Sequence, residues 1–361
     1  MSDDARTPRG RGRAWAGGAG RAVASLGTIE PFPDPRWQIA LQAAIATAAP
    51  VAVGVALGHA DLGLIASTGG FTTLYASWRT PVDRMRLLPF VAVVLTLSAA
   101  LGTLTGPSPV AASIGLMLVA VGVAAIGYGY ALGPPGPLFP MLAYGLAAHV
   151  SELDHGARIQ QPGVVIGAIG AGAVFACLVA AARLLLPQHR RAPATPLRGL
   201  LPGPTWDAAA RELLLRASIV AVVGTAVSYL VVDPGRAYWT VGAGLAVVGA
   251  RPGRGRAAQR GVHRIVGTIA GAGLYVAAAT LATPPPWVLV LVIGVLQFAA
   301  QMLVVRNYAL ALTFITPTVL IIVGAARGAD PLLDVVWERV LDTIVGGILG
   351  ALTGLVHGRR P

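Results

Sequence analysis

The chain has 361 residues, of which 55% are hydrophobic and 12% are charged, and its mean hydropathy is +0.70. A soluble globular domain has about 25% charged residues, so this composition excludes an ordinary soluble enzyme, whose surface needs more polar cover. It also excludes a disordered chain, because disorder requires low hydrophobicity. The class that remains is an all-α, polytopic membrane protein in a lipid bilayer.

The basic residues are 27 in number, all of them Arg, and the formal net charge is +12. They lie between apolar stretches and do not gather on one soluble module, so we expect no nucleic-acid partner. Cys177 is the single cysteine and lies inside an apolar stretch. The sequence therefore predicts no disulfide and no metal site built from several cysteines.

In chain order, residues 1–36 are predicted to form a basic cytoplasmic arm. Twelve apolar stretches follow, most of them near the ~20 residues that a membrane-spanning helix needs. They lie at 38–57, 62–78, 86–105, 109–131, 136–150 and 162–186 in a first half (37–186), and at 212–232, 237–250, 262–283, 286–304, 307–325 and 335–356 in a second half (212–356). The Pro- and Arg-rich segment 187–211 is predicted to link the halves in the cytoplasm, and 357–361 to be a cytoplasmic tail.

The distribution of Arg predicts the orientation. With the N-terminus in the cytoplasm and twelve crossings, 23 of the 27 Arg lie on the cytoplasmic side. The other four are Arg158, Arg236, Arg327 and Arg339. Because positive loops stay inside, we expect both termini in the cytoplasm and the protein in the plasma (inner) membrane.

The two halves look like repeats of each other. In each half a basic loop follows the second helix and a proline lies in the fifth, Pro140 and Pro317, at an offset of about 177–180 residues. Six helices per half start both halves on the same side, so the repeats are predicted to be parallel, related by an axis along the membrane normal.

Four strings in the second half carry a family resemblance: AYWTVGAGLAVVGARP, RGVHRIVGTIAGA, RNYALALTFITPTVLI and ERVLDTIVGGILGAL. They resemble the fusaric-acid-resistance and aromatic-acid-exporter family. The shared positions are Tyr238 and Trp239, then Arg264, Gly267 and Thr268, then Arg339, Asp342, Thr343 and Gly346. The resemblance covers 212–356 well and 36–186 more loosely.

The resemblance implies export of aromatic carboxylates or related compounds across a membrane, and a distant kinship to plant malate channels. Several family members carry a large cytosolic domain between or after the membrane halves. The 187–211 linker leaves no room for one here.

Charged side chains inside membrane segments are the first site candidates. Arg339 and Asp342 are three residues apart and share one helix face; they either bind an anion and exchange a proton, or pin the outer helix end. Arg264 either obeys the positive-inside rule or lines an anion-attracting vestibule. His149 is the proton-relay candidate, and no metal site is expected.

Polar and aromatic residues form a second group of candidates. Gln297 and Gln301, spaced i, i+4, either line a pathway or bond helix to helix. Tyr238 and Trp239 either belong to an aromatic belt or stack on a ligand.

The two prolines are predicted to interrupt their helices at matching places, which points to a transport site. Each is taken to free backbone carbonyls in mid-helix. Hydroxyl groups stand beside them: Thr313 and Thr316 near Pro317, and Tyr144 near Pro140. The alternative is a pair of packing kinks.

The motif GxxxxGK[ST] is absent from the sequence, so we expect no nucleotide site, no cofactor and no enzyme. The sequence predicts a secondary, proton-coupled exporter of small organic anions. A passive anion channel of the same fold and a non-transporting structural protein of the membrane stay open as alternatives, as does a homo-oligomer.

Overall fold

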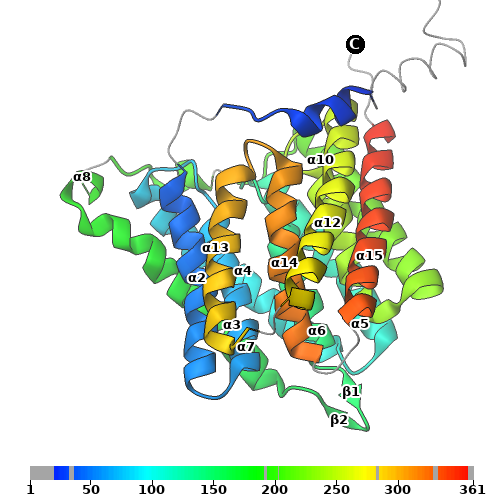
Figure 1. The fold of residues 1–361 in the computed structure, drawn as a ribbon. Helices are drawn as coiled ribbons and strands as arrows, with labels where there is room; N and C mark the ends of the chain where they lie inside the picture. The colour runs from blue at the N-terminus through cyan, green and yellow to red at the C-terminus, as the bar shows by residue number, and fades with distance from the viewer. Residues whose placement is uncertain are drawn as a thin grey trace, which may run out of the picture.

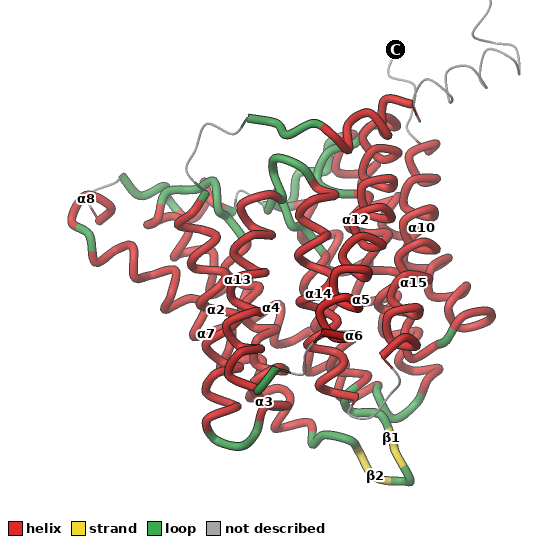
Figure 2. The backbone as a smooth tube through the Cα atoms, viewed as in Figure 1, coloured by secondary structure: helices red, strands yellow, loops and turns green. Residues whose placement is uncertain are grey.

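The computed structural model describes residues 20–31, 36–190, 193–201, 203–281, 284–327 and 332–356, which form a bundle of helices (Figure 1). Strand is confined, within these residues, to a small hairpin of β1 (Leu153–Asp154) and β2 (Ala157–Arg158), drawn in yellow in Figure 2. The predicted all-α class is confirmed.

The helices divide between two halves and a linker. The first half contains α2 (Trp37–Ala56), α3 (Ala60–Ser67) with the 3₁₀ turn η3 (Thr68–Leu74), α4 (Pro81–Thr105), α5 (Pro109–Gly129), α6 (Leu138–His149), and α7 (Pro162–Ala181) with η4 (Ala182–Leu185). The linker contains α8 (Pro187–Arg190) and α9 (Leu197–Leu200). The second half contains α10 (Ala208–Val227) with the π-helical turn η5 (Ser228–Val232), η6 (Pro234–Arg236), α11 (Ala237–Val248), α12 (Arg254–Leu281), α13 (Pro286–Leu303), α14 (Tyr308–Arg327), and α15 (Leu332–Leu352) with η7 (Thr353–Val356). A further 3₁₀ turn, η2 (Ser25–Gly27), precedes both halves.

Eight of the described helical segments are long and apolar enough to cross a membrane. They are those of α2, α4, α5, α7, α10, α12, α13 and α15. The multi-pass membrane class is therefore confirmed. Each of the twelve expected ranges contains a helix, but α6 and α11 are only 12 residues long and the 62–78 range divides into α3 and η3. The arrangement of twelve spans in two parallel repeats stays a prediction.

Capping residues and one glycine set several helix ends. Asp207 and Asn307 precede α10 and α14, and their side-chain oxygens accept from the N–H groups of Ala210 and Leu310 at 2.7 and 3.0 Å, which satisfies donors that have no partner within the helix. At the other end of α11, Gly249 has φ +67°, a conformation that costs glycine least.

The helices pair in the same way in both halves. In the second half α12 packs on α14 and α11 packs on α15; in the first half α4 packs on α6, and α3 with η3 packs on α7. Between the halves, α2 packs on α13 and α5 packs on α10. Two apolar clusters follow from this pairing. One joins the halves through α5, α6, α10 and α11, and the other lies inside the first half among α3, α4, α6 and α7.

Glycines bring the paired helices together at two corresponding places. A Cβ atom on Gly346 of α15 would overlap the backbone of Thr240 on α11, and one on Gly172 of α7 would overlap the backbone of Ala66. Both contacts therefore require a residue without a side chain. The residue numbers differ by 174 between the halves, slightly less than the predicted 177–180.

The two prolines do not match, which corrects one expectation. Pro140 is the third residue of α6, in its first turn, whereas Pro317 lies inside α14 as its tenth residue. Proline is tolerated in a first turn because its nitrogen has no acceptor to lose there. Pro140 therefore does not interrupt its helix, and only Pro317 removes a mid-helix hydrogen bond.

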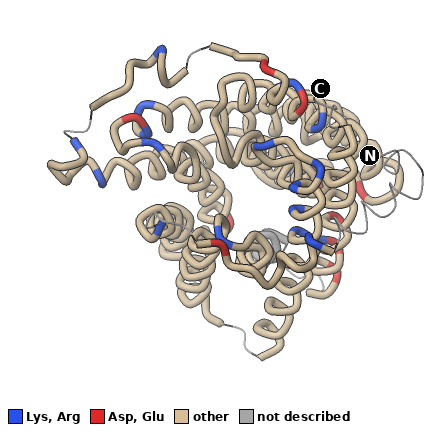
Figure 3. The backbone as a smooth tube through the Cα atoms, turned by 90° about the horizontal axis from the view of Figure 1, so that it is seen from above, with Lys and Arg blue, Asp and Glu red and all other residues tan. Residues whose placement is uncertain are grey.

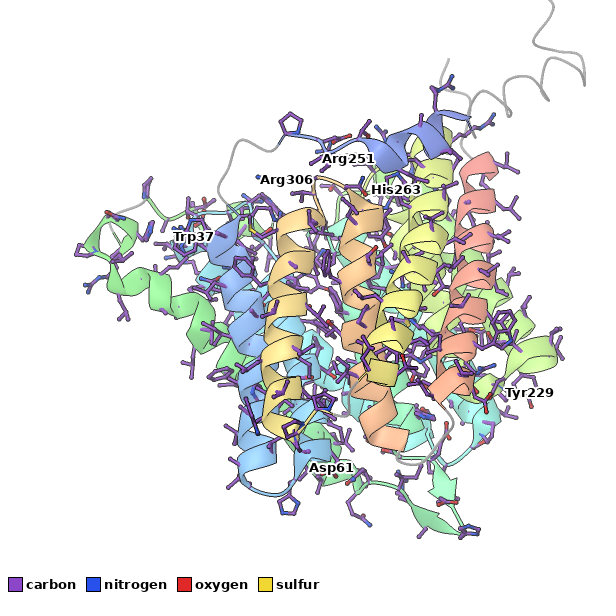
Figure 4. All side chains as sticks on the ribbon, in the orientation of Figure 1. Trp37, Asp61, Tyr229, Arg251, His263 and Arg306 are labelled. Carbon is purple, nitrogen blue, oxygen red and sulfur yellow. The ribbon has the colours of Figure 1, made fainter. Side chains whose placement is uncertain are left out.

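Charged residues divide the bundle into two ends. Figure 4 places Trp37, Arg251, His263 and Arg306 at one end, here called the basic end, and Asp61 and Tyr229 at the other, here called the acidic end, on the side of the β1–β2 hairpin. The arm segment 20–31 and the end of α15 both lie at the basic end (Figure 1). Seen along the bundle, charges are sparse on the helices (Figure 3).

Candidate functional site

One face of α15 carries a buried charged pair. Arg339 is 5% exposed and Asp342 is fully buried, and Thr343 and Gly346 continue the same buried face. Four residues of the motif ERVLDTIVGG therefore turn inward, as the i, i+3, i+4 and i+7 spacing predicts. A guanidinium and a carboxylate at such depth require partners or a ligand.

The guanidinium of Arg339 rests on an aromatic side chain of α11. Its Cζ lies 4.3 Å from the centre of the Trp239 ring, and the Trp239 ring lies 4.8 Å from that of Tyr238. A cation over an indole face is worth about 2 kcal/mol when water is excluded. Trp239 therefore stabilises the charge and leaves the edge of the guanidinium plane unoccupied.

Several polar atoms around Arg339 have no hydrogen-bond partner. These atoms are Nε and Nη1 of Arg339 and Oδ2 of Asp342, while Asp342 Oδ1 accepts from Thr240 Oγ1 at 3.4 Å. Buried polar atoms are nearly always paired, and an arginine fork matches a carboxylate in geometry. The unpaired donors are what a bound carboxylate would satisfy.

Ion pairs of Arg236 with two acids lie beside this region, toward the acidic end. Arg236 Nη1 lies 3.1 Å from Glu338 Oε1, and Arg236 Nε lies 3.5 Å from Asp233 Oδ2. This ion pair joins Glu338 of α15 to the chain just before α11. Sequence reasoning left Arg236 out of the site. The sequence did contain one indication that Arg236 is special: it is one of the four Arg that do not lie on the predicted cytoplasmic side.

Toward the basic end, α12 and α14 add two further side chains. Arg264 is 7% exposed, and its Nη1 donates to Tyr308 Oη at 3.1 Å. Arg260 lies over the same ring, 4.9 Å from its centre. The charges of Arg264 and Arg339 are close enough to interact. Tyr308 lies in the string RNYALALTFITPTVLI but is not among the site residues predicted from the sequence.

A small cavity lies beside Arg339 and Asp342. Its enclosed volume is about 10 Å³, room for about one water molecule. The side chains that line it come from the turn before α11 and from α11, α14 and α15: Arg236, Trp239, Val319, Leu320, Val335, Glu338, Arg339 and Asp342.

A second, larger cavity lies at the acidic end between the halves, with an enclosed volume of about 220 Å³. Tyr144, His149 and Tyr238 line it, together with Glu152. His149 Nδ1 lies 3.2 Å from Glu152 Oε1, and Tyr144 Oη lies 2.6 Å from Thr105 Oγ1. The structure therefore groups Tyr144 and His149 with each other and with Tyr238, and not with Arg339.

The hydroxyl groups of α14 take separate places. Thr313 Oγ1 donates to the carbonyl of Ala309 at 3.2 Å, whereas the buried Thr316 Oγ1 has no partner. Thr316 lies where α14 meets Gly271 of α12. Pro317 follows it inside α14, one turn from the cavity-lining residues of that helix.

Gln297 and Gln301 are both buried on α13, which packs on α2 of the other half. Neither lines the cavity of Arg339. Because α13 also packs on α14, their role in a pathway or in bonding helix to helix stays a prediction. Among the described residues, no group of three or more His, Cys, Asp and Glu side chains has the arrangement of a metal site.

Comparison with known proteins agrees with the resemblance in the second half. Residues 218–353 match the model of the fusaric acid resistance protein-like family. A relative of Bacillus subtilis (strain 168), the uncharacterized membrane protein YvaC, is 40% identical over 130 residues, which cover 34% of this chain and 20% of the relative. This chain therefore spans about a fifth of that relative's length. No solved structure matches the chain described here.

Proposed function

We propose that this protein is a secondary transporter that exports small organic anions through its second half. The observation that carries the proposal is Arg339: a buried guanidinium, stacked on Trp239, with two donor atoms free of partners in a small cavity. A planar fork with open donors suits a carboxylate, and the aromatic rings beside it suit an aromatic one. The match of 218–353 to the fusaric acid resistance protein-like family supports the same class.

Coupling to protons is proposed from Asp342. This carboxyl group is fully buried on the same face as Arg339, and one of its oxygens has no partner. An ionisable group at such a place is suited to carry a proton when the anion binds or leaves. A passive channel would need no such group, which is why we prefer the coupled mechanism.

The membrane arrangement is proposed as two parallel six-helix halves, with the basic end in the cytoplasm. The matching helix pairs of the two halves support the repeat. The placement of the arm and the end of α15 at the basic end supports a common side for both termini, and the positive-inside rule assigns that side to the cytoplasm.

The test is transport of radiolabelled benzoate in proteoliposomes, with and without a pH gradient. We expect saturable uptake that a pH gradient accelerates, and we expect Asp342→Asn to remove the acceleration. Uptake that never saturates and ignores the gradient would favour the channel. No uptake of benzoate or of related carboxylates by folded protein would argue against transport.

A further inference from the structure

We propose that residues 20–31 form a strap that latches α12 to α14 at the basic end, and that the strap must release before the anion site opens toward that end. The consequence for transport rests on the proposed function. The latch itself concerns two helices, and it can be tested without substrate.

The strap is held by residues far away in the sequence. Ser25 Oγ lies 2.8 Å from Nε2 of His263 on α12. The side-chain amide of Asn307, just before α14, donates to the carbonyls of Leu26 and Thr28 at 2.8 and 3.0 Å. One short segment therefore bonds to both helices.

Backbone and packing contacts add to these bonds. The N–H of Glu30 donates to the carbonyl of Arg306 at 3.0 Å. Ala22 is 3% exposed, whereas its neighbour Val23 is 56% exposed, so one face of the strap is packed against the bundle. Figure 1 shows this segment lying across the basic end, where Figure 4 labels His263 and Arg306.

Asn307 connects the strap to the anion site. Its amide nitrogen holds the strap, and its oxygen accepts from the N–H of Leu310 at 3.0 Å and so begins α14. The next residue, Tyr308, accepts a hydrogen bond from Arg264. A change in the strap therefore acts on Asn307, which directly precedes Tyr308, the partner of the buried Arg264.

The strap crosses one end of the contact between α12 and α14, here called the α12–α14 seam. Glycines of α12 leave no side chains between the two helices there. A Cβ on Gly267 of α12 would overlap the backbone of Ala309 on α14, and one on Gly271 would press on Thr316. Helices that meet without interlocking side chains can slide past each other in small shear steps. His263 lies one turn before Gly267, and Asn307 lies two residues before Ala309, so the strap bridges the seam at its basic end.

The two cavities of the site region are consistent with a latched state. One is lined by Arg236 and Glu338 and the other by His149 and Glu152, all toward the acidic end. The basic end of the α12–α14 seam is closed by direct backbone contact, with the strap above it. We infer that this conformation faces the acidic end and that the strap holds it there.

Two variants release the strap by different routes. Ala22→Glu forces a charge into a buried position, and Val23→Glu places the same charge on the exposed neighbour as the matched control. Asn307→Asp removes both donors to the strap and sets a carboxylate against two carbonyls. It keeps the oxygen that caps α14, where aspartate is as good a cap as asparagine.

The readout is the reaction of a thiol inside the seam. Thr316 is fully buried and close to cysteine in size, so Thr316→Cys is made in a Cys177→Ser background. A charged, membrane-impermeant thiol reagent is applied to inverted membrane vesicles and, separately, to right-side-out vesicles. We expect Ala22→Glu and Asn307→Asp to raise the labelling rate about tenfold from the side of the basic end, the effect of losing hydrogen bonds of ordinary strength.

The control Val23→Glu should stay within about twofold of the parent, as surface substitutions do. Equal rates for Ala22→Glu and Val23→Glu, or no increase with Asn307→Asp, would overturn the latch. If Ala22→Glu does not fold, Asn307→Asp decides the question alone. Failure to transport benzoate would leave the labelling result unchanged, so the latch and the proposed function fail separately.

Discussion

The guanidinium of Arg339 lies 4.3 Å above the ring of Trp239, although the two residues are 100 positions apart and stand on different helices. The contact holds the guanidinium by stacking on a ring and not by pairing with an acid. Its Nε and Nη1 donors therefore remain available for a bound anion. Arginine and lysine differ most at such a stacked position, because lysine has a point charge and no plane.

We therefore expect Arg339→Ala to abolish benzoate transport while the protein still reaches the membrane, and Arg339→Lys to restore little. Trp239→Phe should keep part of the activity and Trp239→Leu less, since the cation–π energy falls in that order. Initial rates in proteoliposomes with matched protein amounts measure this. Normal transport by Arg339→Ala would show that the residue only anchors the helix end.

The Arg236–Glu338 pair, at 3.1 Å, sets the charge at the mouth of the cavity. Glu338→Gln removes the nearer of the two acids that pair with Arg236 and leaves Asp233 at 3.5 Å. The mouth then gains one positive charge, so benzoate should bind up to about tenfold more tightly, equivalent to about 1.4 kcal/mol. Arg236→Gln leaves a carboxylate instead and should weaken binding by a similar factor. The double variant should return close to the parent. Equilibrium binding at two salt concentrations checks the signs; effects of the same sign in both single variants would contradict the electrostatic account.

Gly346 should be among the least tolerant positions of the second half. Gly346→Ala places a methyl group into the backbone of Thr240 and should destabilise the protein by about 1–3 kcal/mol, the cost of overpacking. Gly273→Ala is the control, because a Cβ there meets no atom within 4 Å. Thermal unfolding in detergent should show a lower midpoint for Gly346→Ala alone. Equal midpoints would mean that α11 and α15 can separate without loss.

The orientation is tested on two exposed positions. In a Cys177→Ser background, His155→Cys in the β1–β2 hairpin should react with an impermeant maleimide added outside intact cells. Arg190→Cys in the linker should react only after the cells are opened. The reverse pattern would place the basic end outside and invert the proposed direction of transport.

Composition and periodicity predicted the helical membrane class and the helix ranges, because lipid requires long apolar stretches whatever the packing. They also predicted the buried face of α15, since Arg339 and Asp342 follow helical spacing. The partner of Glu338 could not be predicted, because Arg236 reaches it through packing between separate elements. The prediction that Pro140 lies in mid-helix was wrong for a related reason. Whether this proline lies in the first turn depends on the exact residue at which α6 begins, which is Leu138.

The contacts of Gly346 and Gly172 can be used to align the two halves, and aligned residues then differ by 174 in number. In that alignment Arg339 corresponds to Val165 and Trp239 to Ile65. Both counterparts belong to the apolar cluster of the first half.

Under the proposed repeat, one position carries a buried charge in the second half and an apolar core side chain in the first half. The proposed anion site in the second half then has no charged counterpart in the first half, so the chain should bind one anion and not two. Equilibrium dialysis of benzoate should saturate at a stoichiometry of one per chain, and Val165→Ala should change the unfolding midpoint without changing that number.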